Sequence, residues 1–292
     1  MGNPSCEEMR KDTCMAIKAI ALDIDGTLTN DKKVITPRTR EALLAAQRSG
    51  IRLILSSGRP VQGLRALAAE LDLQNNDGLL VAFNGAHVVD AQTDEVLFDQ
   101  PMPEGALRAL VEHMHTFDVI PWITEGRNLY VERGMRHVIT YRSEPFDIVE
   151  YERKHCDLEL IEVDSLLEVC DRPQDKLLCA SEPEYLQKHW RAMYEPFTAA
   201  LSGMFTADFY FEFMAPGIDK GHALAGALPK LGIDASEVVA FGDGQNDISM
   251  ITWAGLGVAM DNAIDETKAA ADMVTASNNE DGIALALKKI LG

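Results

Sequence analysis

The strongest constraint on this chain is an apolar run that ends in two aspartates. Residues 16–24 are rich in isoleucine and leucine, and Asp23, Asp25, Gly26 and Thr27 lie at the end of this run. A short aliphatic run with polar residues at its end is typical of a buried parallel strand. In open α/β sheets, ligands bind at the carboxyl ends of the strands. The sequence therefore predicts a parallel sheet whose functional edge carries Asp23 and Asp25.

The two carboxylates are expected to lie close together. Asp23 and Asp25 are two residues apart, so in an extended chain both side chains point the same way. Two like charges at a buried strand end are costly unless a cation or a shared proton compensates. An Asp-Gly turn with a purely structural role is the alternative. The full pattern Asp-x-Asp-Gly-Thr-Leu, placed at the end of an apolar strand, favours an acidic functional site.

Strands and helices alternate after this first strand. A helix is expected to begin at Thr36-Pro37, with threonine as the N-cap and proline in the first turn. The β-α-β-α-β succession predicts a parallel, doubly wound sheet. The same alternation resumes near the C-terminus. The expected strands of this sheet lie at 51–55, 79–83, 209–214, 237–241, 257–259 and 273–275.

The middle of the chain does not continue this alternation of strands and helices. Residues 87–98 are typical of a hairpin around Asp94, and a helix from 103 to 116 and several short strands follow. This order predicts a separate α+β unit. The expected fold class is α/β, a doubly wound parallel-sheet core with an inserted α+β cap domain. The core takes residues 15–87 and 206–292, the cap takes 88–205, and residues 1–14 form a disordered tail, so that Met15 is a candidate natural start.

The composition limits the classes of partner that are expected. The 292 residues carry a formal net charge of −19, with a pI near 4.7. Such a surface repels nucleic acid and anionic lipid, so neither is an expected partner. No apolar run approaches the length that spans a bilayer. An anionic substrate would need a local positive field supplied by the site itself.

Cysteine usage favours the cytoplasm. The five cysteines are odd in number and irregular in spacing, and no Cys-x-x-Cys occurs. Neither a zinc site nor a disulfide framework is therefore expected. Buried or unreactive thiols in a reducing cytosol are the prediction.

Four polar groups are expected at strand ends or helix starts of the core. Carboxylates suit Mg²⁺, whereas a hydroxyl beside helix-start amides and a lysine suit phosphate. Both halves of a phosphoryl-transfer site are thus present, without a Walker-type glycine loop. The groups are Asp23 with Asp25, Ser57 with Gly58, Lys220, and Asp243 with Asn246 and Asp247.

Chemistry suggests a role for several of these side chains. Asp23 can attack phosphorus and form an aspartyl-phosphate. Asp25 can protonate the leaving oxygen and then take a proton from water. Mg²⁺ bridging Asp23, Asp243 and a phosphate oxygen would offset the negative charge. Lys220 and Ser57 would hold the non-bridging oxygens.

The four segments resemble the four motifs of the haloacid dehalogenase superfamily of phosphatases. More narrowly, the chain resembles the Cof-type sugar phosphatases, whose α+β cap lies between the second and third motifs. Here the interval from Ser57 to Lys220 spans 220 − 57 = 163 positions and contains the predicted insert. The resemblance extends from about Met15 to the C-terminus and includes Asn84-Gly85-Ala86 and the segment 257–263.

The resemblance implies a specific set of roles. Asp23 is the nucleophile, and Asp25 is the acid and base and offers its backbone carbonyl to Mg²⁺. Asp243 is the third metal ligand, and Asp247 reaches the metal through water. Ser57 stands before Gly-Arg where threonine is commoner in the family, and serine keeps the hydroxyl group. The implied phosphate contacts are the Ile24 amide, Ser57, Gly58, Lys220 and Asn246.

The expected function is that of a Mg²⁺-dependent cytoplasmic phosphatase acting on a small phosphorylated metabolite, with a sugar phosphate as the favoured substrate. A phosphosugar mutase or phosphotransferase is the alternative enzyme, because Asp25 could serve either reaction. A catalytically idle phosphate-binding regulatory protein is the alternative from another class. The protein is expected to be a monomer or a homodimer.

Overall fold

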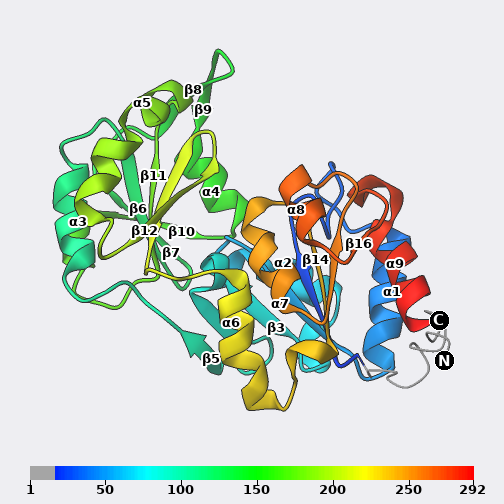
Figure 1. Cartoon of the computed structure of the whole chain (residues 1–292). Coiled ribbons are helices and arrows are strands. Elements are labelled where there is room, and N and C mark those ends of the chain that lie inside the picture. The colour runs from blue at the N-terminus through cyan, green and yellow to red at the C-terminus, as the bar shows by residue number, and fades with distance from the viewer. Residues whose placement is uncertain (1–16) are drawn as a thin grey trace, which may run out of the picture. The chain divides into compact units, whose positions relative to one another are not determined.

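The computed structural model describes residues 17–292 (Figure 1). The chain divides into two compact units, one of residues up to Ile54 together with Ala225–Gly292, and one of Leu55–Leu224. The expected tail 1–14 and the expected start at Met15 lie outside the described residues. The expected cap 88–205 lies inside the second unit, which also contains residues 55–87. The expected core and cap boundaries stay a prediction.

The first unit is built on a parallel sheet with the strand order β16-β15-β14-β1-β2. Segments from opposite ends of the chain meet in it, because β1 pairs in parallel with β14, as the blue and orange strands in Figure 1 show. Every residue of β1 and β14 is buried, as expected for strands covered on both faces. The strands are β1 (Ala19–Asp23), β2 (Arg52–Ser56), β14 (Val238–Gly242), β15 (Leu256–Ala259) and β16 (Met273–Val274).

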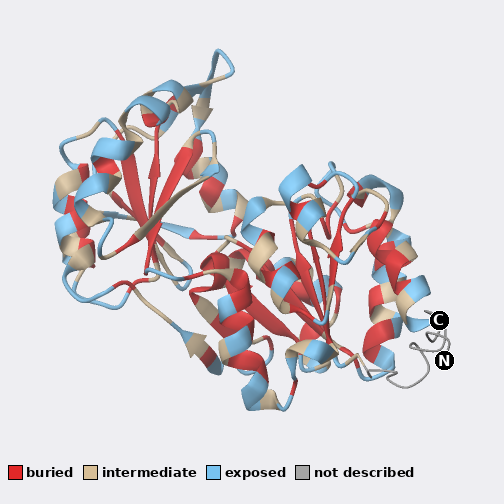
Figure 2. Ribbon diagram, in the orientation of Figure 1, coloured by how far each residue is buried: buried red, intermediate tan, exposed pale blue. Residues whose placement is uncertain are grey.

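The first helix of this unit begins as the sequence predicts. The Thr36 hydroxyl accepts a hydrogen bond from the Thr39 amide at 3.3 Å, and Pro37 occupies the first helical position. Figure 2 shows buried strands between helices that expose their outer faces. The helices are α1 (Pro37–Arg48), α7 (Ile248–Trp253), α8 (Asp265–Ala270), α9 (Gly282–Leu291) and the last residues of α6 (Lys220–Ala227).

In the second unit β3, β4 and β5 are neighbours in that order and pair antiparallel. β3 (Leu79–Ala82) follows α2 (Val61–Glu70), and β4 (His87–Asp90) pairs antiparallel with both β3 and β5 (Val96–Asp99). The expected hairpin around Asp94 is therefore confirmed, but it extends the α/β sheet. A short hairpin loop can only reverse the chain, whereas parallel pairing needs a long crossover. The edge of the sheet is for this reason antiparallel.

The second unit also contains a six-stranded sheet with the order β10-β7-β6-β11-β13-β12. The α+β character expected of the insert is confirmed. The hairpin of β8 and β9 and strand β12 were not predicted. The strand expected at 209–214 in the α/β sheet belongs to this sheet instead, because it pairs antiparallel with β11 and β12. The strands are β6 (Ile120–Glu125), β7 (Asn128–Glu132), β8 (Val138–Tyr141), β9 (Glu144–Asp147), β10 (Glu159–Val163), β11 (Lys176–Ala180), β12 (Ser202–Ala207) and β13 (Tyr210–Met214); the helices are α3 (Ala106–Met114), α4 (Ile148–His155) and α5 (Pro183–Tyr194).

Both faces of this sheet are packed. Leu177 and Cys179 of β11 lie in one apolar cluster, and Leu178 and Ala180 lie in another, because successive side chains of a strand point to opposite faces. The first cluster includes residues of α3 and α5, and the second includes residues of α4. Trp122 is buried in the second cluster.

The described cysteines are free thiols, as expected. Cys156, Cys170 and Cys179 form no disulfide. Burial raises the pKa of all three thiols, that of Cys170 to about 11. The reactive thiolate is therefore disfavoured at each of them. Cys6 and Cys14 lie outside the described residues.

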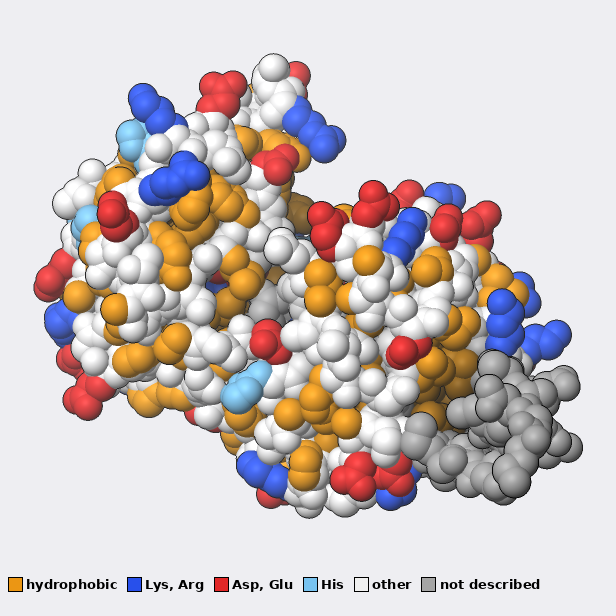
Figure 3. All heavy atoms as spheres, viewed as in Figure 1, with side chains coloured by type: hydrophobic (Ala, Val, Ile, Leu, Met, Phe, Trp, Pro, Cys, Tyr) orange, Lys and Arg blue, Asp and Glu red, His pale blue; other side chains and the backbone are white. Residues whose placement is uncertain are grey.

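On the face shown in Figure 3, acidic and basic side chains are interspersed, and the lysines and arginines of the described residues do not gather into one patch. None of the described helices has the length and hydropathy needed to cross a membrane. The exclusion of nucleic acid and membranes as partners stays a prediction.

A buried ion pair interrupts two otherwise apolar strands. Lys176 Nζ lies 2.8 Å from Glu212 Oε1, and the two side chains are only 7% and 4% exposed. Lys176 Nζ also donates a hydrogen bond to the Gly58 carbonyl at 3.0 Å. Glu212 Oε2 has no hydrogen-bond partner among the described residues. Removal of the lysine would leave a buried carboxylate without its counter-charge.

We expect Lys176→Met to lower the free energy of unfolding by about 3–5 kcal/mol. Urea denaturation measures the change. Lys188→Met, which alters an exposed lysine of α5, is the matched control and should stay within about 0.5 kcal/mol of the wild type. The double variant Lys176→Met/Glu212→Leu should recover most of the loss, because no uncompensated charge remains. A single variant no less stable than the control would contradict a structural role for the pair.

Candidate active site

The first part of the candidate site is the turn that follows β1. Asp23 is the last residue of the strand and is 7% exposed. The Leu28 amide donates to the Asp23 carbonyl at 3.1 Å, and the Thr29 amide and hydroxyl donate to the Ile24 carbonyl at 2.9 and 3.0 Å. Gly26 has a φ of +91°, in the left-handed region that glycine adopts without strain. The predicted strand and turn are confirmed.

Asp25 differs from Asp23 in its exposure. It is exposed, and its Oδ1 lies 2.8 Å from Lys33 Nζ. The expectation that both carboxylates point the same way assumed an extended chain through Asp25, but β1 ends at Asp23. The side chain of Asp25 is therefore not part of the acidic group described next, and its catalytic role stays a prediction.

Asp243, the residue after β14, approaches the turn closely. The Thr27 hydroxyl donates a hydrogen bond to Asp243 Oδ1 at 2.6 Å. A Cβ added to Gly26 would lie 2.3 Å from Asp243 Oδ2. Only glycine fits here, because any side chain would displace the Asp243 carboxylate. Gly26 thus serves both the turn and the packing of the two strand ends.

Asp247 holds the loop that carries Asp243. It is 1% exposed, and its Oδ2 accepts hydrogen bonds from the amides of Asp243 at 2.9 Å and Gly244 at 2.8 Å. Carboxylate oxygens of Asp23, Asp243 and Asp247 lie within 4.8 Å of one another. Asn246, by contrast, is exposed. The acids that the sequence places at the ends of two distant strands do come together.

These three residues, which we call the acidic group, suit a hard divalent cation. Like charges this close, two of them on buried residues, need a compensating positive charge or a shared proton. All the side-chain donors are carboxylate oxygens, the ligand type that Mg²⁺ prefers. The donor set therefore fits the predicted Mg²⁺.

The structure adds positioning residues that the sequence reasoning did not single out. Asn262 Nδ2 donates to the Gly26 carbonyl at 2.8 Å, and Asn262 Oδ1 accepts from the Asn278 amide at 3.0 Å. Thr267 Oγ1 donates to the Gly244 carbonyl at 2.8 Å. An asparagine shortly after strand β15 was a usable signal, whereas nothing in the local sequence distinguishes Thr267.

The predicted phosphate-binding residues of the second unit also meet. Lys220, the first residue of α6, is fully buried, and its Nζ donates to the Ser56 carbonyl at 3.1 Å. Ser57 follows β2 and is 5% exposed. Gly85 allows α6 to begin here, because a Cβ on it would lie 2.3 Å from the Asp219 carbonyl.

The neighbourhood of Gly58 includes a lysine that the sequence reasoning did not weigh. Lys176 contacts the Gly58 carbonyl, and its ion pair with Glu212 was described above. A signal was present in the sequence, because a lysine opens the apolar strand Lys-Leu-Leu-Cys-Ala and a glutamate interrupts Tyr-Phe-Glu-Phe-Met. Charged residues in two apolar strands indicate a buried pair.

Comparison with known proteins places this architecture in a family. A family model described as haloacid dehalogenase-like hydrolase matches residues 20–287. The Bacillus subtilis protein YxeH is 32% identical over 282 residues, which cover 94% of this chain and 98% of the relative. A 5-amino-6-(5-phospho-D-ribitylamino)uracil phosphatase of the same organism is 31% identical over 280 residues, covering 93% of this chain and 95% of that protein.

Solved structures agree with the sequence relatives. A haloacid dehalogenase-like hydrolase from Bacteroides thetaiotaomicron has a TM-score of 0.84 at 33% identity, over 94% of this chain and 99% of its own. A sugar phosphatase of HAD subclass IIB has a TM-score of 0.77 at 26% identity, and the match covers 93% of this chain and 98% of that protein. The resemblance seen in the sequence motifs is confirmed: the chain belongs to the haloacid dehalogenase-like hydrolases and, within them, to the Cof-type phosphatases, which hydrolyse phosphoric monoesters.

Proposed function

We propose that this phosphatase is Mg²⁺-dependent and that it hydrolyses a sugar phosphate or a similar small phosphorylated metabolite. The observation that carries the proposal is the acidic group of Asp23, Asp243 and Asp247, whose carboxylate oxygens suit a divalent cation and which lies just beyond β1 and β14. Two of the similar proteins support the substrate class. One is named for a phospho-D-ribityl compound, and the other is named a sugar phosphatase.

In the proposed reaction Asp23 is the nucleophile. Its carboxylate attacks phosphorus, the bond from phosphorus to the ester oxygen breaks, and an aspartyl-phosphate forms. Asp25 gives its proton to the departing alkoxide, so that the alcohol leaves. It then takes a proton from the water that attacks the aspartyl-phosphate, which releases phosphate and restores Asp23. The placement of Asp25 on the exposed side of the turn supports this role, since a proton donor must reach the leaving group.

The proposed metal ligands are a carboxylate oxygen of Asp23, the backbone carbonyl of Asp25 and a carboxylate oxygen of Asp243, with Asp247 linked through water. When bound, Mg²⁺ would offset the repulsion between Asp23 and the phosphate. The hydrogen bonds from two backbone amides to Asp247 support this arrangement, because they hold the loop of Asp243 in place.

The proposed phosphate contacts come from the chain segments that follow β1, β2 and β14 and from the start of α6. Burial of Ser57 and Lys220 supports the proposal, since a fully buried ammonium is costly unless it faces acceptors or anions. The six-stranded sheet of the insert is proposed to select the substrate. The contacts are the Ile24 amide, Ser57, Gly58, Lys220 and Asn246.

We expect Asp23→Asn to lower kcat by at least about 10³-fold, because an amide cannot attack phosphorus. Release of inorganic phosphate from a hexose phosphate measures the reaction. Asp31→Asn, an exposed aspartate in the following loop, is the matched control and should keep wild-type activity. Far-UV circular dichroism checks that the fold is intact. A kcat within tenfold of the wild type would remove Asp23 from the nucleophile role, and formation of an isomerised sugar phosphate would identify a mutase.

Metal removal gives a second test. We expect chelation to abolish activity and added Mg²⁺ to restore it. Asp243→Asn should raise the Mg²⁺ concentration needed for half-maximal activity at least about tenfold. Asp265→Asn, on the exposed start of α8, should leave that concentration unchanged. Full activity in the chelator, or an unaltered Mg²⁺ requirement in Asp243→Asn, would argue against the proposed metal site.

A further inference from the structure

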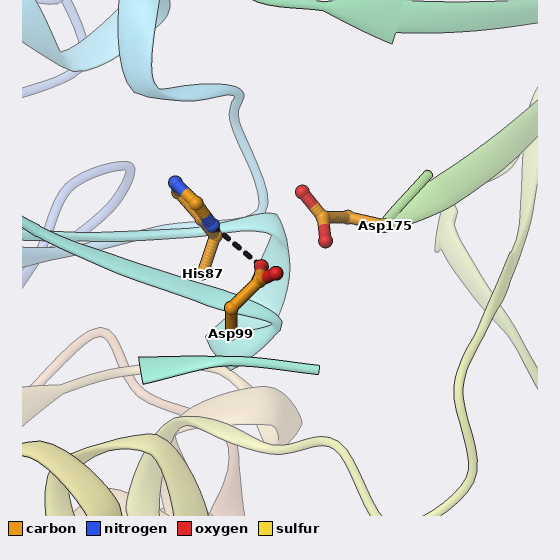
Figure 4. A group of neighbouring side chains, drawn as sticks. All are labelled: His87, Asp99 and Asp175. Atoms are coloured by element: carbon orange, nitrogen blue, oxygen red, sulfur yellow. Dashed lines mark hydrogen bonds and ion pairs between the residues drawn. The ribbon is translucent and has the colours of Figure 1, made fainter. Parts of the chain in front are cut away.

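A second group of metal-ligand side chains lies in the second unit, and the proposed reaction uses none of them. His87 is the first residue of β4, Asp99 is the last residue of β5, and Asp175 directly precedes β11. Figure 4 shows the imidazole and the Asp99 carboxylate joined by a hydrogen bond, with the Asp175 carboxylate turned toward them. We call these three residues the hairpin group.

The backbone fixes the geometry of the hairpin group. His87 and Asp99 lie opposite each other in the β4–β5 ladder, and His87 Nδ1 is 2.7 Å from Asp99 Oδ1. The chain before Asp175 is tied down by the hydrogen bond from the Met102 amide to the Gln174 carbonyl, at 2.9 Å. One ligand atom of each side chain lies within 4.8 Å of the other two. The side chains are therefore held close enough to share one ion.

The charges in the hairpin group call for a cation. Two carboxylates face a single imidazole, and Asp175 is only partly exposed. Burial and the nearby Asp99 raise the pKa of Asp175 to about 6. Lys176, the next residue along the chain, is directed to Glu212 and the Gly58 carbonyl instead. A bound dication would relieve the repulsion between Asp99 and Asp175.

The chemistry of the donors indicates which cation. One imidazole nitrogen and two carboxylate oxygens form a mixed set that suits first-row transition metals such as Zn²⁺, whereas Mg²⁺ prefers oxygen alone. Three protein ligands leave a further position for water. We propose that His87, Asp99 and Asp175 bind a transition-metal dication of the Zn²⁺ type. The ion would take the place of the hydrogen bond between His87 and Asp99, and it would join the β4–β5 hairpin to the start of β11.

This site does not depend on the proposed phosphatase mechanism, and its test can be read without activity. Zn²⁺ is titrated by calorimetry into the full chain in excess Mg²⁺, which competes with Zn²⁺ for any site made of oxygen ligands alone. We expect His87→Gln to weaken the binding of one Zn²⁺ per chain by at least about tenfold. Any Zn²⁺ bound by thiols elsewhere is common to wild type and variant, so the difference isolates the hairpin group.

The matched control is His115→Gln. His115 Nε2 also lies 2.9 Å from a carboxylate, that of Glu132, but it is not part of a three-residue group among the described residues. We expect this variant to bind Zn²⁺ as the wild type does. Asp175→Asn is the second test, and it should also lose the rise in melting temperature that Zn²⁺ gives the wild type. Equal Zn²⁺ affinity in wild type and His87→Gln, or no Zn²⁺ binding in the presence of Mg²⁺, would overturn the proposal.

Discussion

The main physical constraint on the candidate site of the first unit is repulsion among three carboxylates. Oxygens of Asp23, Asp243 and Asp247 lie within 4.8 Å of one another, and both Asp23 and Asp247 are buried. Such an arrangement persists only if the backbone holds it and a positive charge offsets it. The backbone part is visible in the structure, because two amides donate to Asp247. Three carboxylates gathered in this way suit a divalent cation, and this donor set is the physical argument for one.

The fold brings these residues together through strand pairing. β1 and β14 are more than 200 positions apart in the chain, yet they pair in parallel register, so the residues that follow them meet at the same edge of the sheet. Gly26 then permits an approach that any side chain would block. Thr27 and Asn262 fasten the turn to the neighbouring loops. The site is thus built on strand ends, with short polar contacts that set its final geometry.

Much of this follows from the sequence, because the signals are local. The apolar runs before Asp23 and Asp243 predict their strands, and the alternation of strands and helices predicts parallel pairing in the first unit. Which residues meet across long separations in the chain could not be predicted. The ion pair of Lys176 and Glu212 depends on the pairing of β11 with β13, and the hairpin group depends on a chain segment 76 positions beyond Asp99. Asp25 lies beyond the end of β1, so the alternation of side chains along an extended strand does not by itself fix the direction of its side chain.

A high-resolution crystal structure of the wild type grown with Mg²⁺ tests the central claim most directly. Our account predicts one ion at about 2.0–2.1 Å from a carboxylate oxygen of both Asp23 and Asp243. An ion held by only one of the two aspartates, or separate ions on each, would contradict it.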